Sequence, residues 1–76
     1  MSSSRAPTPL TLALGERIRK LRKQRNWTQA DMQAHTNLDR GHISEMETGK
    51  RAISIVTLQV VARCFGTTMA RLLRGL

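Results

Sequence analysis

The side chains best equipped for recognition by hydrogen bonds lie between residues 28 and 51. Arg40 ends in a planar guanidinium, which can donate to both acceptors on the edge of a guanine. Glu45 can accept a hydrogen bond from the amino group of a cytosine. These residue types therefore suit the reading of base pairs, although Arg40 can also serve simply as a clamp on a phosphate group.

The sequence offers little support for catalysis or for the binding of a metal ion. It contains no glycine-rich phosphate loop and no plausible pair of nucleophile and base, so we expect no enzymatic activity. His35 and His42 are too far apart along the chain to share one helical face, and no cluster of Cys or Asp joins them. We therefore expect no metal ion and no other cofactor, and we assign His42 to a phosphate group.

The charge of the chain points to a polyanionic partner. Thirteen Lys and Arg residues face five Asp and Glu residues, which gives a net charge of +8 on 76 residues. A solvated basic surface without a partner is the alternative interpretation. Trp27 and Phe65 are the only aromatic residues. Proteins that bind single strands or RNA loops usually offer several aromatic side chains for stacking, so the composition favours duplex DNA.

Cysteine content and hydropathy indicate the compartment. The single cysteine, Cys64, excludes an internal disulfide and fits a reducing environment. No apolar run approaches the roughly 18 residues of a membrane span, and the N-terminus lacks the apolar segment of a signal peptide. We expect a cytoplasmic protein with no membrane contact and no evident small-molecule ligand.

Capping residues and apolar spacing divide the chain into five short helices and give no strand signal. Apolar residues recur at the spacing of one buried helical face, for example at Leu14, Ile18 and Leu21. We expect Gly15 to weaken the first helix by up to about 1 kcal/mol. The predicted helices run from Pro9 to about Asn26, from Thr28 to Thr36, from Asp39 to about Thr48, from Ser54 to Gly66, and from Thr67 or Thr68 onwards.

The chain is predicted to be a single all-α domain of five helices. Residues 1 to 8 are predicted to be a disordered N-terminal arm, and residues 9 to 76 to form the compact domain. An arm that carries Arg5 can reach into a minor groove, and a frayed terminus is the simpler alternative.

Four strings of residues together resemble the phage repressor and Cro type of helix-turn-helix. They are LGERIRKLR from Leu14, TQ at Thr28, LDRGHISEMETGKR from Leu38, and S-I-x-T-L-x-x-V-A-x-x-F-G from Ser54. Within that family the chain is most similar to the controller proteins of restriction-modification systems. The resemblance covers roughly residues 14 to 73 and implies that the third helix, about residues 39 to 48, enters the major groove.

The resemblance also implies roles for single residues. Base contacts fall on Arg40, Gly41, Ser44 and Glu45, and a phosphate contact falls on Gln29. By their residue type and their position on or just after the third helix, His42, Lys50 and Arg51 are also predicted to contact phosphates. Gln29 opens a helix, where free N–H groups and the helix dipole favour an anion, although it can also simply face solvent. The resemblance further implies that Arg22 and Glu47 form a structural ion pair.

Two residues depart from the family pattern. Gln33 stands where a small Ala is usual, so either the second and third helices cross at a wider distance or Gln33 tilts outward. Asn37 stands where Gly is usual, and because Asn also adopts positive φ, we expect no loss there.

Helix 54 to 66 carries a second apolar stripe besides its core residues. Val56, Val60 and Cys64 recur every four residues and lie about 150° from the buried stripe. Apolar residues on two sides of one helix suggest a subunit interface, although tolerated surface valines are the alternative. Met69, Leu73 and Leu76 can extend this patch.

These observations together predict a transcription regulator that binds duplex DNA in a sequence-specific way. As a homodimer on a palindromic operator, it would span half-sites about 34 Å apart. The competing hypothesis is an antitoxin that uses this fold to bind a toxin. It is disfavoured because the sequence shows no dedicated toxin-binding segment.

Overall fold

The computed structural model describes residues 7 to 76, which contain five helices and no strand. The all-α prediction is therefore confirmed for this part of the chain. The predicted arm, with Arg5, lies almost entirely outside the described residues. The helices are α1 (Pro9–Gln24), α2 (Gln29–Thr36), α3 (Arg40–Glu47), α4 (Ile55–Cys64) and α5 (Met69–Leu73).

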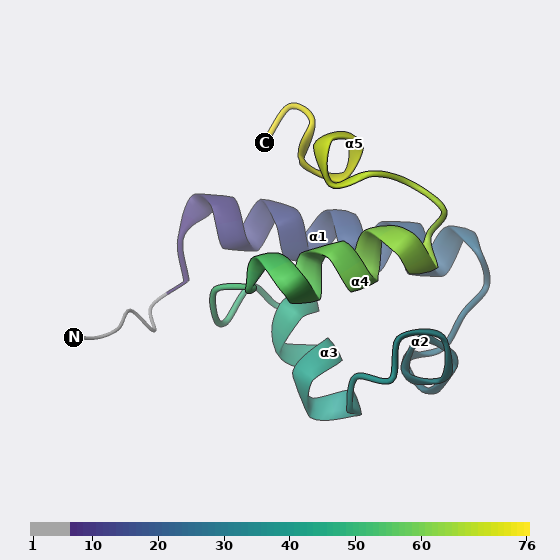
Figure 1. Cartoon of the computed structure of the whole chain (residues 1–76). Helices are drawn as coiled ribbons and strands as arrows, with labels where there is room; N and C mark the ends of the chain where they lie inside the picture. Colours follow the sequence, from purple (N-terminus) through teal and green to yellow (C-terminus); the bar gives the residue numbers. More distant parts are fainter. Residues whose placement is uncertain (1–6) are drawn as a thin grey trace.

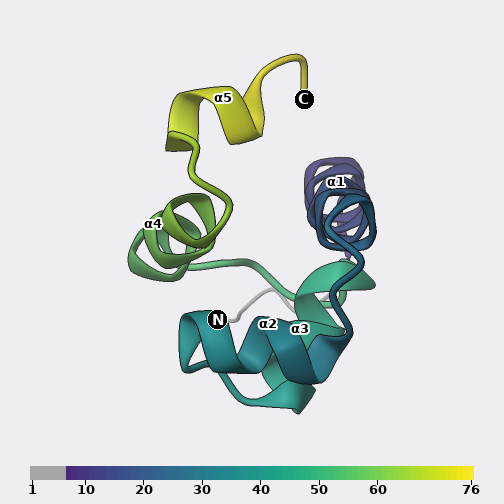
Figure 2. The ribbon, with the colours of Figure 1, turned by 90° about the vertical axis from the view of Figure 1, so that its right-hand side faces the viewer.

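The five helices are arranged in three levels (Figures 1 and 2). Helices α2 and α3 lie together at one end of the molecule, α1 and α4 lie at the middle level on opposite sides of it, and α5 covers the other end. Their inward residues form one core, to which every helix contributes. The buried apolar residues are Leu14, Ile18, Met32, Ile43, Met46, Leu58, Val61, Ala62, Phe65 and Leu72.

Each helix begins at a residue whose side chain accepts a backbone N–H of the first turn, as the sequence predicts. At α2, Thr28 and Asp31 form a complete capping box, in which each side chain accepts from the backbone N–H of the other residue. The Thr28 hydroxyl accepts from the Asp31 N–H at 3.0 Å, and the Asp31 carboxylate accepts from the Thr28 N–H at 2.8 Å. The backbone N–H of Thr28 lowers the pKa of Asp31, because it stabilises the ionised carboxylate.

The turns between helices use left-handed residues at the predicted places. Asn26 has a φ of 59° after α1, and Asn37 has a φ of 64° between α2 and α3. Asn37 thus takes the conformation for which glycine is usual, as expected. The side chain of Gln33 is exposed, which agrees with the expectation that it tilts outward.

Gly15 has a different role from the one predicted for it. A Cβ at this position would lie 2.9 Å from the carbonyl oxygen of Glu47 and even closer to that of Met46. The missing side chain therefore allows the backbones of α1 and α3 to approach each other. At the same interface the Thr11 hydroxyl donates to the carbonyl oxygen of Gly49 at 3.0 Å, which attaches the first turn of α1 to the turn after α3.

Among the helices that the structure describes, none combines the length and the apolar character needed to cross a membrane.

Candidate nucleic-acid interface

Helix α3 is attached to the core by one side and exposes the other. Ile43 and Met46 are 0% exposed. Arg40, Gly41 and Ser44 are exposed on the other side of the helix. The four residues that the resemblance assigns to base contact therefore come from one outward surface, with Glu45 at its partly buried edge.

The first turn of α3 is fixed by its capping residue. The Asp39 carboxylate accepts from the backbone N–H of His42 at 2.8 Å. Arg40 follows this cap directly, and its side chain has no hydrogen bond or ion pair to any of residues 7 to 76. At Gly41 an added Cβ would meet only the Asp39 carboxylate, at 3.3 Å. The Arg40 guanidinium is thus available to a ligand, and no neighbouring backbone crowds Gly41.

A buried ion pair ties the other end of α3 to α1. Arg22 Nε lies 2.7 Å from Glu47 Oε2, and Arg22 Nη2 donates to Glu47 Oε1 at 2.9 Å. The two side chains are only 9% and 2% exposed. Arg22 Nη1 also donates to the carbonyl oxygen of Trp27 at 2.7 Å. The hydrogen bond to Glu47 raises the pKa of Arg22 above its ordinary value, so the guanidinium stays ionised.

Gln29 joins the same network from the start of α2. Its Nε2 donates to Glu47 Oε1 at 3.3 Å, and its side chain is partly buried. The sequence predicts a phosphate contact for Gln29, with a solvent-facing side chain as the alternative. In the structure the side-chain amide is oriented by α3, a contact that local sequence patterns do not reveal.

The turn after α3 carries a second ion pair that the sequence analysis did not predict. Arg51 Nη2 lies 2.8 Å from Glu45 Oε1, and these side chains are 56% and 40% exposed. Lys50 is exposed beside them. A shallow depression in the surface is bordered by Asp39, Gly41, His42, Glu45 and Arg51. Residues assigned to base contact and to phosphate contact thus meet at one depression.

The predicted dimer stripe falls into two groups. Val56 is 66% exposed and Val60 is partly exposed, but Cys64, Met69 and Leu73 pack partly against the core of the same chain. Their apolar surface is therefore partly covered without any partner. Ile55 is 71% exposed beside Val56, and the sequence analysis missed it. Its position next to Val56 at the start of α4 could have indicated that Ile55 belongs to the same exposed apolar patch.

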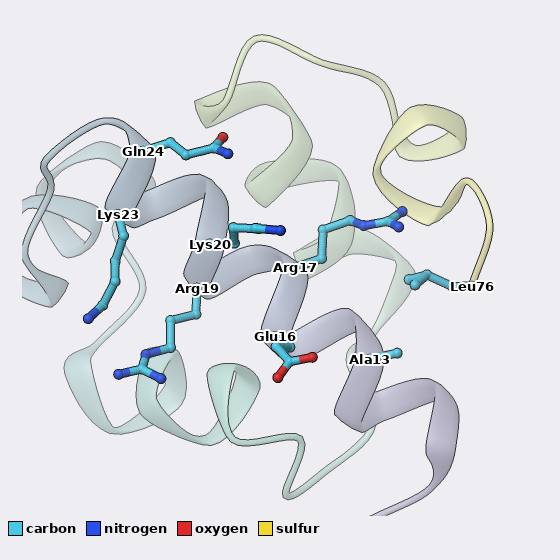
Figure 3. A pocket seen from close by; sticks show the side chains of 8 residues that line it. All are labelled: Ala13, Glu16, Arg17, Arg19, Lys20, Lys23, Gln24 and Leu76. Carbon is cyan, nitrogen blue, oxygen red and sulfur yellow. The ribbon is translucent and has the colours of Figure 1, made fainter.

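Some basic side chains of α1, and Arg25 just after it, donate hydrogen bonds within the protein, whereas Arg19, Lys20 and Lys23 are exposed. Arg17 donates to the carbonyl oxygens of Leu72, at 3.1 Å, and Arg74. Arg25 donates to the carbonyl oxygen of Phe65 at 2.7 Å. Figure 3 shows Arg17 extending towards the C-terminal turn and Arg19 and Lys23 extending away from it. An open groove along the outer side of α1 is lined by Ala13, Glu16, Arg17, Arg19, Lys20, Lys23, Gln24 and Leu76.

Packing accounts for the two aromatic residues, for His35 and for Cys64. Trp27 stacks on His35 with ring centroids 4.1 Å apart, and on Phe65 at 5.8 Å. Within residues 7 to 76 no group of three His, Cys, Asp or Glu side chains is placed to hold a metal ion. Burial raises the pKa of the Cys64 thiol to about 11, so this thiol stays protonated at neutral pH.

Comparison with known protein families gives a match over most of the chain. The helix-turn-helix family model matches residues 18–72. The control protein C.MunI of a Mycoplasma species is 33% identical over 64 residues, which cover 83% of this chain and 86% of that protein. The immunity repressor protein of Bacillus phage phi105 is also 33% identical, over 72% of this chain and 38% of its own length.

Solved structures give the same result. The restriction-modification controller protein C.AhdI from Aeromonas hydrophila superposes with a TM-score of 0.77 and 26% identity, over 82% of this chain and 94% of its own. The controller protein C.Esp1396I, solved as a tetramer in complex with its natural 35 base-pair operator, has a TM-score of 0.77 and 26% identity. The match covers 86% of each chain. The similarity to controller proteins expected from the sequence is therefore confirmed.

Proposed function

The chain belongs to the helix-turn-helix family and is a DNA-binding transcriptional regulator of the controller and repressor type, and on this basis we propose that it binds a palindromic operator as a homodimer. Each subunit places α3 in the major groove. The observation that carries the proposal is the two-sided character of α3. Ile43 and Met46 fix the helix in the core, while Arg40 and Ser44 stay exposed for contact with bases.

Base recognition in this proposal rests on Arg40, Gly41, Ser44 and Glu45. The exposed guanidinium of Arg40 donates to the two acceptors of a guanine, and Glu45 accepts from a cytosine amino group. Gly41 carries no side chain, which permits close approach of the DNA at the depression beside it.

Phosphate contacts fall on the residues that flank α3. Gln29 lies at the positive end of the α2 dipole, and His42, Lys50 and Arg51 surround the outward surface of α3. Such contacts set affinity and register, whereas base contacts set the choice of sequence.

Dimerisation in this proposal uses the exposed start of α4 and the adjoining α5. Ile55, Val56 and Val60 supply the exposed apolar surface, and Cys64, Met69 and Leu73 adjoin it. A two-fold axis there leaves both α3 helices free and separates the half-sites by about 34 Å. The tetrameric assembly of C.Esp1396I on its operator supports self-association in this fold.

We further propose that the protein is cytoplasmic and non-enzymatic, and that residues 9 to 76 form its DNA-binding domain. The similarity to a control protein and an immunity repressor favours this function over the antitoxin hypothesis. Neighbouring genes for an endonuclease and a methyltransferase would assign the protein to a restriction-modification system.

Selection of bound duplexes from a random pool tests the proposal. We expect a two-fold symmetric consensus, bound with a log–log salt slope near −0.9 per phosphate neutralised. Binding that prefers single-stranded RNA, or that is insensitive to salt, would refute it.

Sedimentation of Val60→Glu tests the interface. The substitution places two like charges near the symmetry axis, so we expect a folded monomer with much weaker operator binding. Gln24→Glu adds the same charge on the outer side of α1 and serves as the control. A wild-type protein that is monomeric at tens of micromolar would refute the homodimer, and a Val60→Glu dimer of unchanged affinity would locate the interface elsewhere.

A further inference from the structure

Glu45 and Arg51, whose opposite charges DNA repels and attracts, form an ion pair at the edge of the proposed interface. Glu45 carries a negative charge, which the phosphate backbone repels, whereas Arg51 carries a positive charge, which the backbone attracts. In the structure Arg51 Nη2 and Glu45 Oε1 lie 2.8 Å apart. While this contact persists, the Arg51 guanidinium has part of its donor capacity engaged within the protein.

The contact is not required to build the turn that carries it. The backbone N–H of Lys50 donates to the carbonyl oxygen of Glu45 at 3.0 Å, and the N–H of Gly49 donates to that of Met46 at 3.1 Å. Gly49 also adopts the left-handed conformation that ends α3. The turn therefore holds its shape without the ion pair, which leaves the two side chains able to change partners.

Exposure makes an exchange of partners inexpensive. The two side chains are 56% and 40% exposed, so water and salt compete with the attraction between them. A cytosine amino group at the depression can replace Arg51 as the partner of Glu45, and a phosphate can replace Glu45 as the partner of Arg51.

On the basis of the proposed function, we propose that Glu45 withholds Arg51 from the phosphate backbone until a cytosine amino group takes its place. On duplexes without a cytosine at that position, Glu45 stays paired with Arg51, and the protein loses one phosphate contact per subunit. On the operator, Glu45 turns to the base and Arg51 to the phosphate. Arg51 thereby contributes to sequence preference although it contacts no base.

A double-mutant cycle measured on random duplexes tests this exchange. Glu45→Gln frees Arg51, so random duplexes should bind about two- to fivefold more tightly per subunit. Their salt slope should become steeper by about 0.9 per subunit, which corresponds to one phosphate. In the Arg51→Ala background the same substitution should leave the slope unchanged.

Two controls separate the exchange from general electrostatics. Glu16→Gln removes the same charge from the outer side of α1 and should leave the slope unchanged. Lys50→Ala removes a cation beside Arg51, and Glu45→Gln should retain its full effect in that background. Thermal melting confirms that each variant is folded before binding is measured.

Two outcomes would overturn the exchange. If the effect of Glu45→Gln persists in full with Arg51→Ala, Glu45 acts by simple repulsion of phosphates. If replacing the cytosine of the operator leaves the salt slope unchanged, Arg51 is not released by the base. A wild-type protein that binds its selected operator no better than random duplexes would instead refute the proposed function itself.

Discussion

The two sides of α3 each carry a glutamate that pairs with an arginine from outside the helix. Glu47 meets Arg22 of α1 through two hydrogen bonds, and both side chains are almost completely buried. Glu45 meets Arg51 of the following turn through one ion-pair contact, and the Arg51 and Glu45 side chains are 56% and 40% exposed. The same type of ion pair, between a glutamate and an arginine, therefore has two different roles. In the interior it fixes the helix to the domain, and at the surface it can be opened by a competing partner.

The largest effect is expected at the buried pair. Removing Arg22 or Glu47 alone leaves an uncompensated charge in the interior, so Arg22→Ala or Glu47→Ala should destabilise the fold by about 3–5 kcal/mol. The double variant should cost less than the sum of the two. Chemical denaturation of the four proteins measures this coupling. Additive losses below about 1 kcal/mol would mean that the buried pair behaves like a surface pair and would remove the contrast.

The second largest effect on stability is expected at Gly15, where the backbones of α1 and α3 approach each other closely. Gly15→Ala places a Cβ against the backbone of α3, so we expect a net destabilisation of about 1–3 kcal/mol. Helix propensity alone predicts the opposite sign, a gain of up to about 1 kcal/mol. Gly41→Ala is the matched control, because only the Asp39 carboxylate lies near its Cβ. A Gly15→Ala variant that melts higher than the wild type would show that the helices need no such approach.

The exposed side of α3 should respond in binding rather than in stability. If Arg40 reads a guanine, Arg40→Ala should cost about 1–3 kcal/mol on the operator and relax preference at one base pair per half-site. Lys50→Ala should weaken all duplexes alike. Anisotropy titrations on the operator and on random duplexes distinguish them. Equal losses on both duplexes for Arg40→Ala would make it a phosphate clamp.

The smallest effect is expected for the stability of the exposed pair. The coupling between Glu45 and Arg51 in the free protein should lie below about 1 kcal/mol and should shrink as salt is added. Thermal melts of the two single variants and the double variant, at low and high salt, measure it. A large coupling that ignores salt would show that this pair is structural too, which the proposed exchange does not allow.

Local features of the fold were predictable because they depend on a few adjacent residues. The caps at Thr8, Thr28 and Asp39 and the left-handed turns at Asn26 and Asn37 each follow from short-range chemistry. The buried faces follow from apolar spacing in the same way. These features were sufficient to give the number and order of the helices.

Contacts between distant residues were not predictable from spacing. Arg22 and Glu47 are 25 positions apart, and resemblance to a family, not the pattern of residues, suggested that they pair. The role of Gly15 was missed because propensity describes one helix and carries no information on its neighbours. Cys64 and Leu73 pack partly against the core because α5 folds back towards α1, which the periodicity of α4 alone cannot reveal.

The basic side chains along the outer side of α1 have a kinetic consequence. Arg19, Lys20 and Lys23 lie on α1, whereas α3 lies at one end of the molecule (Figures 1 and 3). Long-range attraction to a duplex is therefore not confined to the surface proposed to read it. We expect the protein to meet DNA rapidly at low salt, often with α1 foremost. Rotation on the duplex, rather than diffusion to it, then determines how soon α3 reaches the groove.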